Sequence, residues 1–360
     1  MVPDIVSRYL WVREHGIHVA SCITFVRGDN EDDVLRRFGG DPGTARLMTL
    51  TEVAEESCNS RYPYGYAPLL MVDTIGAWVV IFEDNGSQGV RHEVLQSASQ
   101  GTEMVSVYWN VNALQRFIYA ADGKTITEFE LLFPKSRQGA EPDRLLDYMR
   151  DLPFEMGNTL ATAMALSERI TGVRIDRSWF EIERRVVEVT PLPHEPHPDL
   201  KPEWTSLASY HPEIATLIRD APATVWRRIA LLAADRSATA ALIAGATAIK
   251  AALQALWSGE SDLAAPRANL APLLQTLERA RLTAPQPTIL QSAGGERSLF
   301  FDSGQEQRIE ASHRVHAGYA VRNALLPDPL MAALHSVYEA SLAVSDKERF
   351  FQDVIAIIHQ

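Results

Sequence analysis

Short runs of alternating or continuous hydrophobic residues mark the first half of the chain and predict β-strands. One side of residues 17–26 carries Ile17, Val19, Ile23 and Phe25, which is the alternation of a half-buried strand. Residues 77–82 are apolar on both faces, as is typical of a central strand. Further strands are expected at 105–111, 116–121, 125–132 and 184–189, with Asp122-Gly123 as a hairpin turn.

Helical signals lie before, between and after these strands. Residues 30–38 have acidic side chains in the first turn, arginines in the last turn, and Gly39-Gly40 directly afterwards, which predicts a helix and its end. Two more helices are expected at about 142–151 and 158–171, the second ending at Gly172. Hairpins with helices gathered before and after them favour an α+β domain with a mostly antiparallel sheet.

The second half of the chain has helical spacing almost throughout. Asp328 before Pro329 is typical of a helix N-cap with proline in the first turn, and Ser345 to Glu348 has the spelling of a capping box. An interruption around Gly294-Gly295 predicts a small hairpin within residues 288–301. This half is therefore expected to be an all-α domain, with helices at 224–234, 237–257, 269–281, 306–325, 329–344 and 348–359.

A proline-rich segment separates the two halves. Five prolines lie between residues 191 and 202, where they remove backbone donors and favour an extended connector. The sequence predicts an α+β domain over 1–190, a linker over 191–203 and a helical domain over 204–360. Of the net charge of −12, residues 1–190 carry −9, from 19 Lys and Arg against 28 Asp and Glu.

The excess of acidic over basic residues argues against nucleic acids and anionic membranes as partners. With 34 Lys and Arg against 46 Asp and Glu, the chain lacks the basic excess that neutralises nucleic-acid phosphates or attaches to anionic membranes. The N-terminus has no signal-peptide pattern, and the longest uncharged apolar run, 237–249, is too short to span a membrane. The two cysteines form no disulfide framework. We expect a cytoplasmic protein that binds neither nucleic acid nor membrane.

No catalytic motif with a defined spacing occurs in the sequence. Gly123-Lys-Thr125 lacks the earlier glycine of a phosphate-binding loop, and no Gly-x-Gly-x-x-Gly is found. His18 and Cys22 would share one side of a strand. They are either a catalytic Cys-His pair or, as is commoner, a histidine near a buried structural cysteine. His194 and His197 are two potential metal ligands, too few for a closed site, and linker composition explains them equally well. We therefore expect no cofactor and no metal.

Several short sequence segments in the first domain resemble those of a known family. These segments are Thr24–Gly28, Val34–Pro42, Gly76–Trp78, Glu83–Gly86, Asn110–Ala113 with Phe117, and Ala165–Val173. Over residues 1–190 the chain resembles an uncharacterised domain-of-unknown-function family of high-GC filamentous bacteria. That family usually has Gly-Gly-Trp where this chain has Gly76-Ala77-Trp78. The resemblance implies no activity, because the family has no established catalytic residues, and nothing comparable is recognised for residues 200–360.

Five polar residues are candidates for ligand contacts. If the strand at 105–111 continues, Asn110 and Asn112 share one face and offer two amides to a polar ligand; otherwise they bond local backbone and cap a turn, which is commoner for Asn. His313, His316 and Arg322 have helical spacing in the second half. They would line a polar pocket between helices or, as we favour, lie on a solvated helix face.

Tyr62, Tyr64 and Tyr66 form the most distinctive candidate surface. They lie in Arg61-Tyr-Pro-Tyr-Gly-Tyr66, and such rings either supply rigid contact area at an interface or pack onto the sheet. Together with the concentrated negative charge and the lack of catalytic motifs, they favour a non-catalytic interaction or regulatory protein with a basic protein partner. An example is an immunity protein or another component of a bacterial conflict system. Self-association stays open.

A second hypothesis is an enzyme or sensor for a small polar molecule. It places the ligand in a cleft between the two domains, with Asn110, Asn112, His313, His316 and Arg322 as its polar groups. The two hypotheses differ in whether those groups converge on one pocket. Under the first hypothesis, the basic partner should dock on residues 1–190, and salt should weaken its binding.

Overall fold

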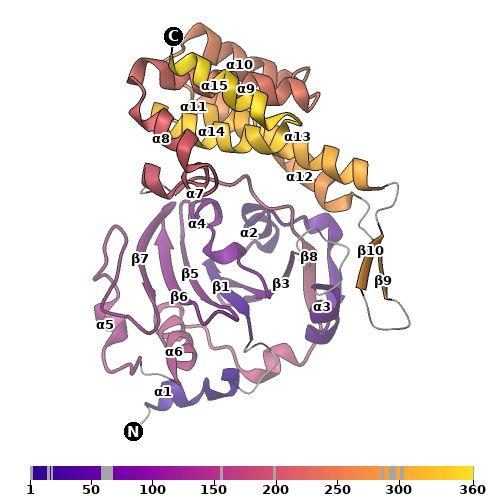
Figure 1. Ribbon diagram of the computed structural model, residues 1–360. Coiled ribbons are helices and arrows are strands. Elements are labelled where there is room, and N and C mark those ends of the chain that lie inside the picture. The colour runs from indigo at the N-terminus through magenta and orange to yellow at the C-terminus, as the bar shows by residue number, and fades with distance from the viewer. Residues whose placement is uncertain are drawn as a thin grey trace. The chain divides into compact units, whose positions relative to one another are not determined.

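The chain divides into two compact units, Met1–Glu195 (unit 1) and Pro196–Gln360 (unit 2). The computed structural model describes residues 3–13, 17, 19–57, 68–154, 157–197, 200–284, 288–291, 297–300 and 304–359. Unit 1 combines an antiparallel sheet with helices, whereas the described part of unit 2 is helical apart from one short strand pair (Figure 1). The α+β prediction for the first half and the all-α prediction for the second are confirmed.

The sheet of unit 1 has eight strands in the order β2-β8-β3-β4-β1-β5-β6-β7. Every neighbouring pair is antiparallel, and β8 from the end of the unit lies between β2 and β3. The strands are β1 Ser21–Arg27, β2 Arg46–Met48, β3 Leu69–Ile75, β4 Trp78–Asp84, β5 Glu103–Trp109, β6 Gln115–Ala121, β7 Lys124–Glu130 and β8 Arg184–Glu188.

Helices cover both faces of this sheet. One apolar cluster joins the sheet to α2 and α4, and a larger one joins its other face to α1, η1 and α6 (Figure 1). Asn30 caps α2 through its side chain. Helix α6 ends at Gly172 with φ 72°, as the sequence predicts. The helices and 3-10 turns are α1 Asp4–Ser7, η1 Leu10–Arg13, α2 Glu31–Arg37, η3 Pro42–Thr44, α3 Leu50–Ser57, η4 Gln88–Val90, α4 His92–Ala98, α5 Leu146–Met149, α6 Thr159–Thr171 and η5 Arg177–Phe180.

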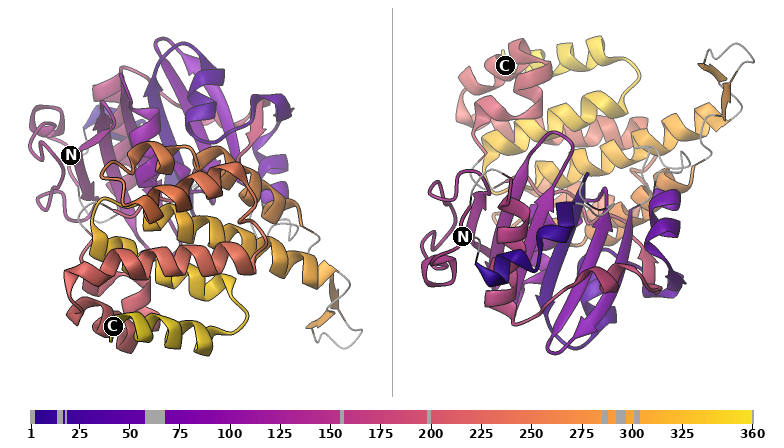
Figure 2. Two further views of the ribbon diagram at one scale, coloured as in Figure 1. Left: turned by 90° about the horizontal axis from the view of Figure 1, so that it is seen from above. Right: turned by 90° about the horizontal axis from the view of Figure 1, so that it is seen from below.

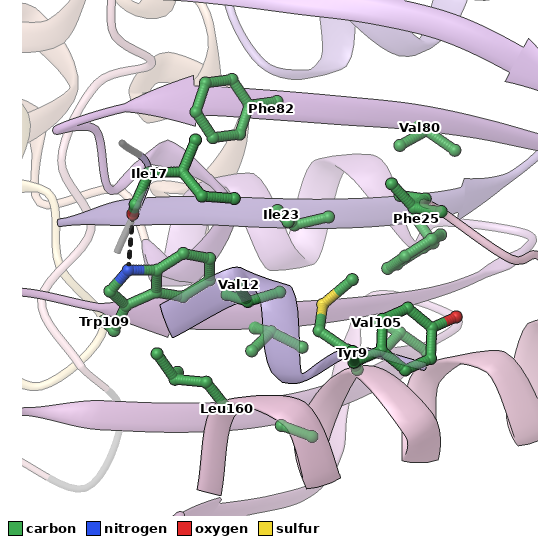
Figure 3. Packing of buried hydrophobic residues seen from close by; sticks show 14 of the residues in the cluster. Tyr9, Val12, Ile17, Ile23, Phe25, Val80, Phe82, Val105, Trp109 and Leu160 are labelled. Carbon is green, nitrogen blue, oxygen red and sulfur yellow. Dashed lines mark hydrogen bonds between the residues drawn. The ribbon is translucent and has the colours of Figure 1, made fainter. Parts of the chain in front are cut away.

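Trp109 of β5 is a fully packed member of the larger core cluster. Its indole Nε1 donates to the backbone oxygen of Ile17 at 2.9 Å, and Ile23 and Phe25 of β1 lie on the same face (Figure 3). Alternation along β1 turns Cys22, Thr24 and Val26 to the opposite face. Because the sheet is buried on both faces, its central strands contain almost no exposed residues.

The predicted helix at 142–151 is mostly wrong, because only Leu146–Met149 is helical. The residues before it follow the free side of β7 instead. Gln138 exchanges two backbone hydrogen bonds with Glu128, and Ala140 N donates to Thr125 O. These bonds protect the edge of the sheet, and the last of them, from Glu141 N to Ile126 O, precedes the short helix.

Unit 2 is organised around three long helices, α9, α13 and α14, which pack against one another (Figure 2). Two further apolar clusters connect them to the surrounding helices. The elements are η6 Pro202–Trp204, α7 Ser206–Tyr210, α8 Pro212–Asp220, α9 Ala223–Ala240, α10 Thr247–Ser258, α11 Ala264–Ala268, α12 Ala271–Thr283, β9 Thr288–Gln291, β10 Arg297–Phe300, α13 Gly304–Ala324, α14 Pro329–Ala343 and α15 Lys347–Ile358. None of the helices in the described ranges is long and apolar enough to cross a membrane.

The alanine-rich stretch of unit 2 folds differently from the prediction. A single helix, α9, runs through Arg236, and the break falls at 241–246 rather than near 235. Leu242 adopts φ 58°, and the N–H groups of Ile243 and Ala244 both donate to Ala238 O, which is a left-handed helix ending. The sequence does not indicate this helix ending, because residues 237–249 carry no charge and have the composition of one continuous buried helix.

Candidate interaction surface

Two exposed apolar side chains line a hollow at the β6–β7 edge of the sheet in unit 1. A hollow of about 330 Å³ is lined there by Leu114 and Phe133, which are 42% and 63% exposed. Three charged side chains, Arg116, Glu128 and Glu130, complete what we call the edge surface. The hollow is also lined by Phe129, Ser136 and Gln138.

The β6–β7 hairpin fixes the floor of the edge surface. Its turn residues Asp122 and Gly123 have φ 49° and 74°, which matches the twist of a tight hairpin. Phe117 and Phe129 are paired in register, and their rings stack with centroids 5.3 Å apart. The register of the strands therefore determines which side chains face the hollow.

Asn110 holds the loop that presents Leu114. Its Oδ1 accepts hydrogen bonds from Asn112 N at 3.0 Å and Leu114 N at 3.1 Å, and its Nδ2 donates to the Tyr108 hydroxyl. Strand β5 ends at Trp109, so the two asparagines do not continue one strand face. The capping interpretation describes Asn110, while Asn112 is exposed.

Phe133 is presented by a second bonded turn. Its N–H donates to Glu130 O, and its carbonyl accepts from Ser136 N, both at 2.9 Å. The sequence predicts a strand up to residue 132, but β7 ends at Glu130, so Leu132 and Phe133 leave the sheet. An apolar pair followed by Pro134 was the available signal of this turn.

The charges of the edge surface are only partly balanced. Arg116 Nη2 lies 2.7 Å from Glu128 Oε2, which neutralises that pair. Glu130 Oε2 accepts a backbone hydrogen bond from Leu132 N at 3.0 Å. One arginine against two glutamates leaves the hollow acidic, beside two apolar walls.

A second hollow, of about 610 Å³, lies at the opposite ends of β1, β5 and β6. Its central carboxylate, Glu103, receives Arg27 Nη1 at 2.8 Å and the Tyr119 hydroxyl at 2.7 Å. Burial and this hydrogen bond raise the pKa of Tyr119 well above its ordinary value. Since the protein itself occupies both oxygens of Glu103, we assign this hollow no ligand.

The candidates in unit 2 differ in burial: His313 and His316 are partly buried, and Arg322 is buried. His316 Nδ1 lies 2.8 Å from Glu339 Oε2 on α14, and burial followed by the charge of His316 lowers the pKa of His313. Arg322 is only 6% exposed, so it is not on the solvated face that we favoured from the sequence. These residues belong to unit 2, whereas Asn110 and Asn112 belong to unit 1, and the shared-cleft hypothesis stays a prediction.

The tyrosine segment and the His18–Cys22 pair are the remaining candidates from the sequence. Tyr62, Tyr64 and Tyr66 lie outside the described residues, as does His18. Cys22 is fully buried, and its burial and the nearby Glu83 raise the pKa of its thiol, which disfavours a nucleophile. Among the residues that the structure describes, no group of three or more His, Cys, Asp or Glu is arranged to hold a metal ion.

Replacing Asn110 should test how the loop is held. We expect Asn110→Ala to lower the free energy of unfolding by about 1–2 kcal/mol, because two backbone donors lose their acceptor. Asn110→Asp keeps that acceptor and should cost less, and Asn112→Ala should be within about 0.5 kcal/mol of wild type. Urea unfolding of the three variants measures this order. Equal losses for both alanine variants would contradict it.

Comparison with known proteins gives a family but no activity. A model of a family described as a family of unknown function (DUF6461) matches residues 5–191. This agrees with the resemblance seen over residues 1–190. No curated protein and no solved structure matches the chain.

Proposed function

The chain belongs to the DUF6461 family of unknown function, and we propose that it is a non-catalytic interaction protein whose unit 1 binds a basic protein segment at the edge surface. The observation that carries this proposal is the pair of exposed apolar walls, Leu114 and Phe133, around an acidic hollow. Exposed apolar side chains beside charged rims are typical of protein-binding sites. A toxin covered by an immunity protein is the kind of basic partner that we propose.

The proposed occupant is a segment with one apolar anchor flanked by Lys or Arg. The anchor would contact Leu114 and Phe133, and a flanking cation would approach Glu130. Glu130 lies across the strand pair from Arg116, but the guanidinium of Arg116 forms its ion pair with Glu128. Strand addition is disfavoured, because Gln138 and Ala140 already bond the free side of β7. Net −9 on residues 1–190 adds long-range attraction for such a segment.

A peptide selection on the full-length chain tests the proposal. We expect a displayed random library to yield peptides that share one aliphatic or aromatic residue flanked by Lys or Arg. In fluorescence anisotropy titrations, Phe133→Ala and Leu114→Ala should each raise Kd by about tenfold or more, because the anchor loses a wall. Glu130→Gln should raise Kd by a smaller factor and flatten its salt dependence.

A matched control distinguishes binding at the edge surface from nonspecific binding to any exposed apolar side chain. Leu47 is 67% exposed on β2, at the other edge of the sheet, and Leu47→Ala should leave Kd unchanged. Selected peptides without basic residues would contradict the charge argument. A Kd that Phe133→Ala leaves unchanged would exclude the edge surface.

A further inference from the structure

Arg116 is the basic residue among the side chains that line the edge surface. It lies on β6, and the register of the β6–β7 hairpin places Glu130 directly opposite it and Glu128 diagonally across. Because side chains alternate along a strand, Glu128 and Glu130 point to the same face of the sheet as Arg116. One cation therefore lies within reach of two carboxylates.

The guanidinium of Arg116 pairs with the diagonal carboxylate. Its Nη2 donates to Glu128 Oε2 at 2.7 Å, and the two side chains are only 34% and 22% exposed. The backbone of Glu128 is fixed as well, because its N–H and its carbonyl both bond Gln138 at the edge of the sheet. A charge-assisted hydrogen bond between partly buried groups on paired strands keeps its geometry. Arg116 therefore neutralises Glu128.

Glu130 is held closer to the apolar walls. Its Oε2 accepts a hydrogen bond from Leu132 N at 3.0 Å, in the turn that also presents Phe133. Glu128 lies two residues further back along β7, which is about 7 Å in a strand. A segment anchored between the apolar walls thus meets Glu130 first and the Arg116–Glu128 pair beyond it.

We propose that Arg116 sets the charge selectivity of the edge surface, so that a partner segment gains from one cation beside its apolar anchor but not from a second. This inference rests on the function proposed above and specifies the partner. A second cation would approach the guanidinium of Arg116 and compete with it for Glu128, and like-charge repulsion offsets the attraction. Selective interfaces commonly combine an attractive contact with such a repulsive one.

The partner segment therefore differs from a polybasic tail. The net charge of −9 on residues 1–190 attracts a tail with many Lys or Arg residues, but the tail obtains only one close ion pair at the edge surface. A segment with one apolar residue and one neighbouring cation obtains both the wall contacts and that ion pair. Arg116 thus favours a segment of mixed sequence over a long basic run.

Paired peptides test this selectivity on the full-length chain. A peptide from the selection described above, with one cation beside its anchor, receives either arginine or glutamine two residues beyond that cation, on the side away from the anchor. This spacing matches that of Glu130 and Glu128 in an extended segment. The ratio of the two Kd values, glutamine peptide over arginine peptide, is the gain from a second cation, and fluorescence anisotropy at one fixed salt concentration measures it.

The gain should depend on Arg116. In the wild type we expect a gain within about twofold of one, because Arg116 occupies Glu128. In Arg116→Gln the carboxylate of Glu128 becomes available, and the gain should rise to about five- to tenfold.

Changes to Glu128 distinguish a selective role from a structural one. In Glu128→Gln the guanidinium of Arg116 loses its diagonal partner and turns to Glu130 opposite it, so Kd of the glutamine peptide should rise by about threefold or more. The double variant Arg116→Gln with Glu128→Gln leaves Glu130 available. It should bind the glutamine peptide about as well as wild type and show no gain from the second cation.

Arg27→Gln is the matched control. Arg27 is a strand arginine of the same sheet, and its Nη1 lies 2.8 Å from Glu103 Oε1 in the other hollow. Its replacement changes the net charge by the same amount as Arg116→Gln. We expect the gain of the wild type, because long-range charge alone does not free Glu128.

Two results would overturn the role of Arg116. One is an equal gain in wild type and Arg116→Gln, whether both are near one or both are high. The other is an equal rise in Arg116→Gln and Arg27→Gln, which would assign the effect to net charge. Binding that Phe133→Ala weakens would still support the proposed function in either case. If no peptide binds the wild type in a way that depends on Phe133, the proposed function fails, and the selectivity fails with it.

Discussion

Trp109→Ala should lower the free energy of unfolding of unit 1 by about 3–5 kcal/mol, the largest loss that we expect from a single substitution. The side chain is 2% exposed and lies among Val12, Ile17 and Leu160 (Figure 3). Truncation to alanine removes most of its dispersion contacts and leaves a cavity that a rigid sheet cannot close.

Trp109→Phe separates the packing of the ring from its hydrogen bond. We expect a loss of about 1–2 kcal/mol, because the Nε1 donor disappears while most of the ring volume remains. Ile17 O then depends on the Ser21 hydroxyl, which lies 3.1 Å from it but shares its single proton with Ala20 O at 2.6 Å. Urea unfolding, with hydrogen exchange of β1 and β5 peptides as the measure of unit 1, gives both values. Equal losses for the two variants would mean that the hydrogen bond, not the cavity, dominates.

Raising the pH from about 4 to about 8 should remove about 3 kcal/mol of stability through Glu83 alone. Burial raises its pKa to about 7 in the folded chain, from the ordinary value of 4.5 in the unfolded chain. The folded state thus binds the extra proton between these values. The contribution is fully present below pH 4.5 and is lost as the pH rises through 7.

Comparison with Glu83→Gln isolates this contribution from other titrating groups. The difference in unfolding free energy between wild type and variant should change by about 3 kcal/mol across the range, because the wild type becomes less stable relative to the variant as the pH rises. Urea unfolding at several pH values measures it, again with unit 1 followed by exchange of β1 and β4 peptides. A constant difference would show that Glu83 ionises normally.

Local signals along the chain were sufficient for most of the fold. The hairpin at Asp122-Gly123 and the end of α6 at Gly172 depend on backbone conformations that few residues adopt, so the residue types alone predicted them. The helix break near 241–246 was missed because Leu242 takes a left-handed conformation without being glycine. Only the bonds from Ile243 and Ala244 to Ala238 reveal it.

The candidate site was predicted much less well. Asn110 was recognised as a turn residue or a ligand, but the residue that it presents, Leu114, was not singled out. Exposure of Leu114 and Phe133 depends on where β5 and β7 end and on which side of the sheet each residue falls. Those are properties of the pairing between β5, β6 and β7, which composition and periodicity do not contain.

The sequence by itself determined the class of each half, the alternation of the strands and the concentration of negative charge in residues 1–190, because these follow from residue types and their local spacing. Only the tertiary structure decided the strand order, in which β8 lies between β2 and β3, and the burial of Glu83 beneath η4. It also decided that Leu114 and Phe133 share one hollow. The strand order and the shared hollow join residues that are distant in the chain, and the burial of Glu83 depends on the pairing of β4 with β1 as well as on η4. The energies of all three depend on contacts and solvent exclusion that exist only once the sheet has formed.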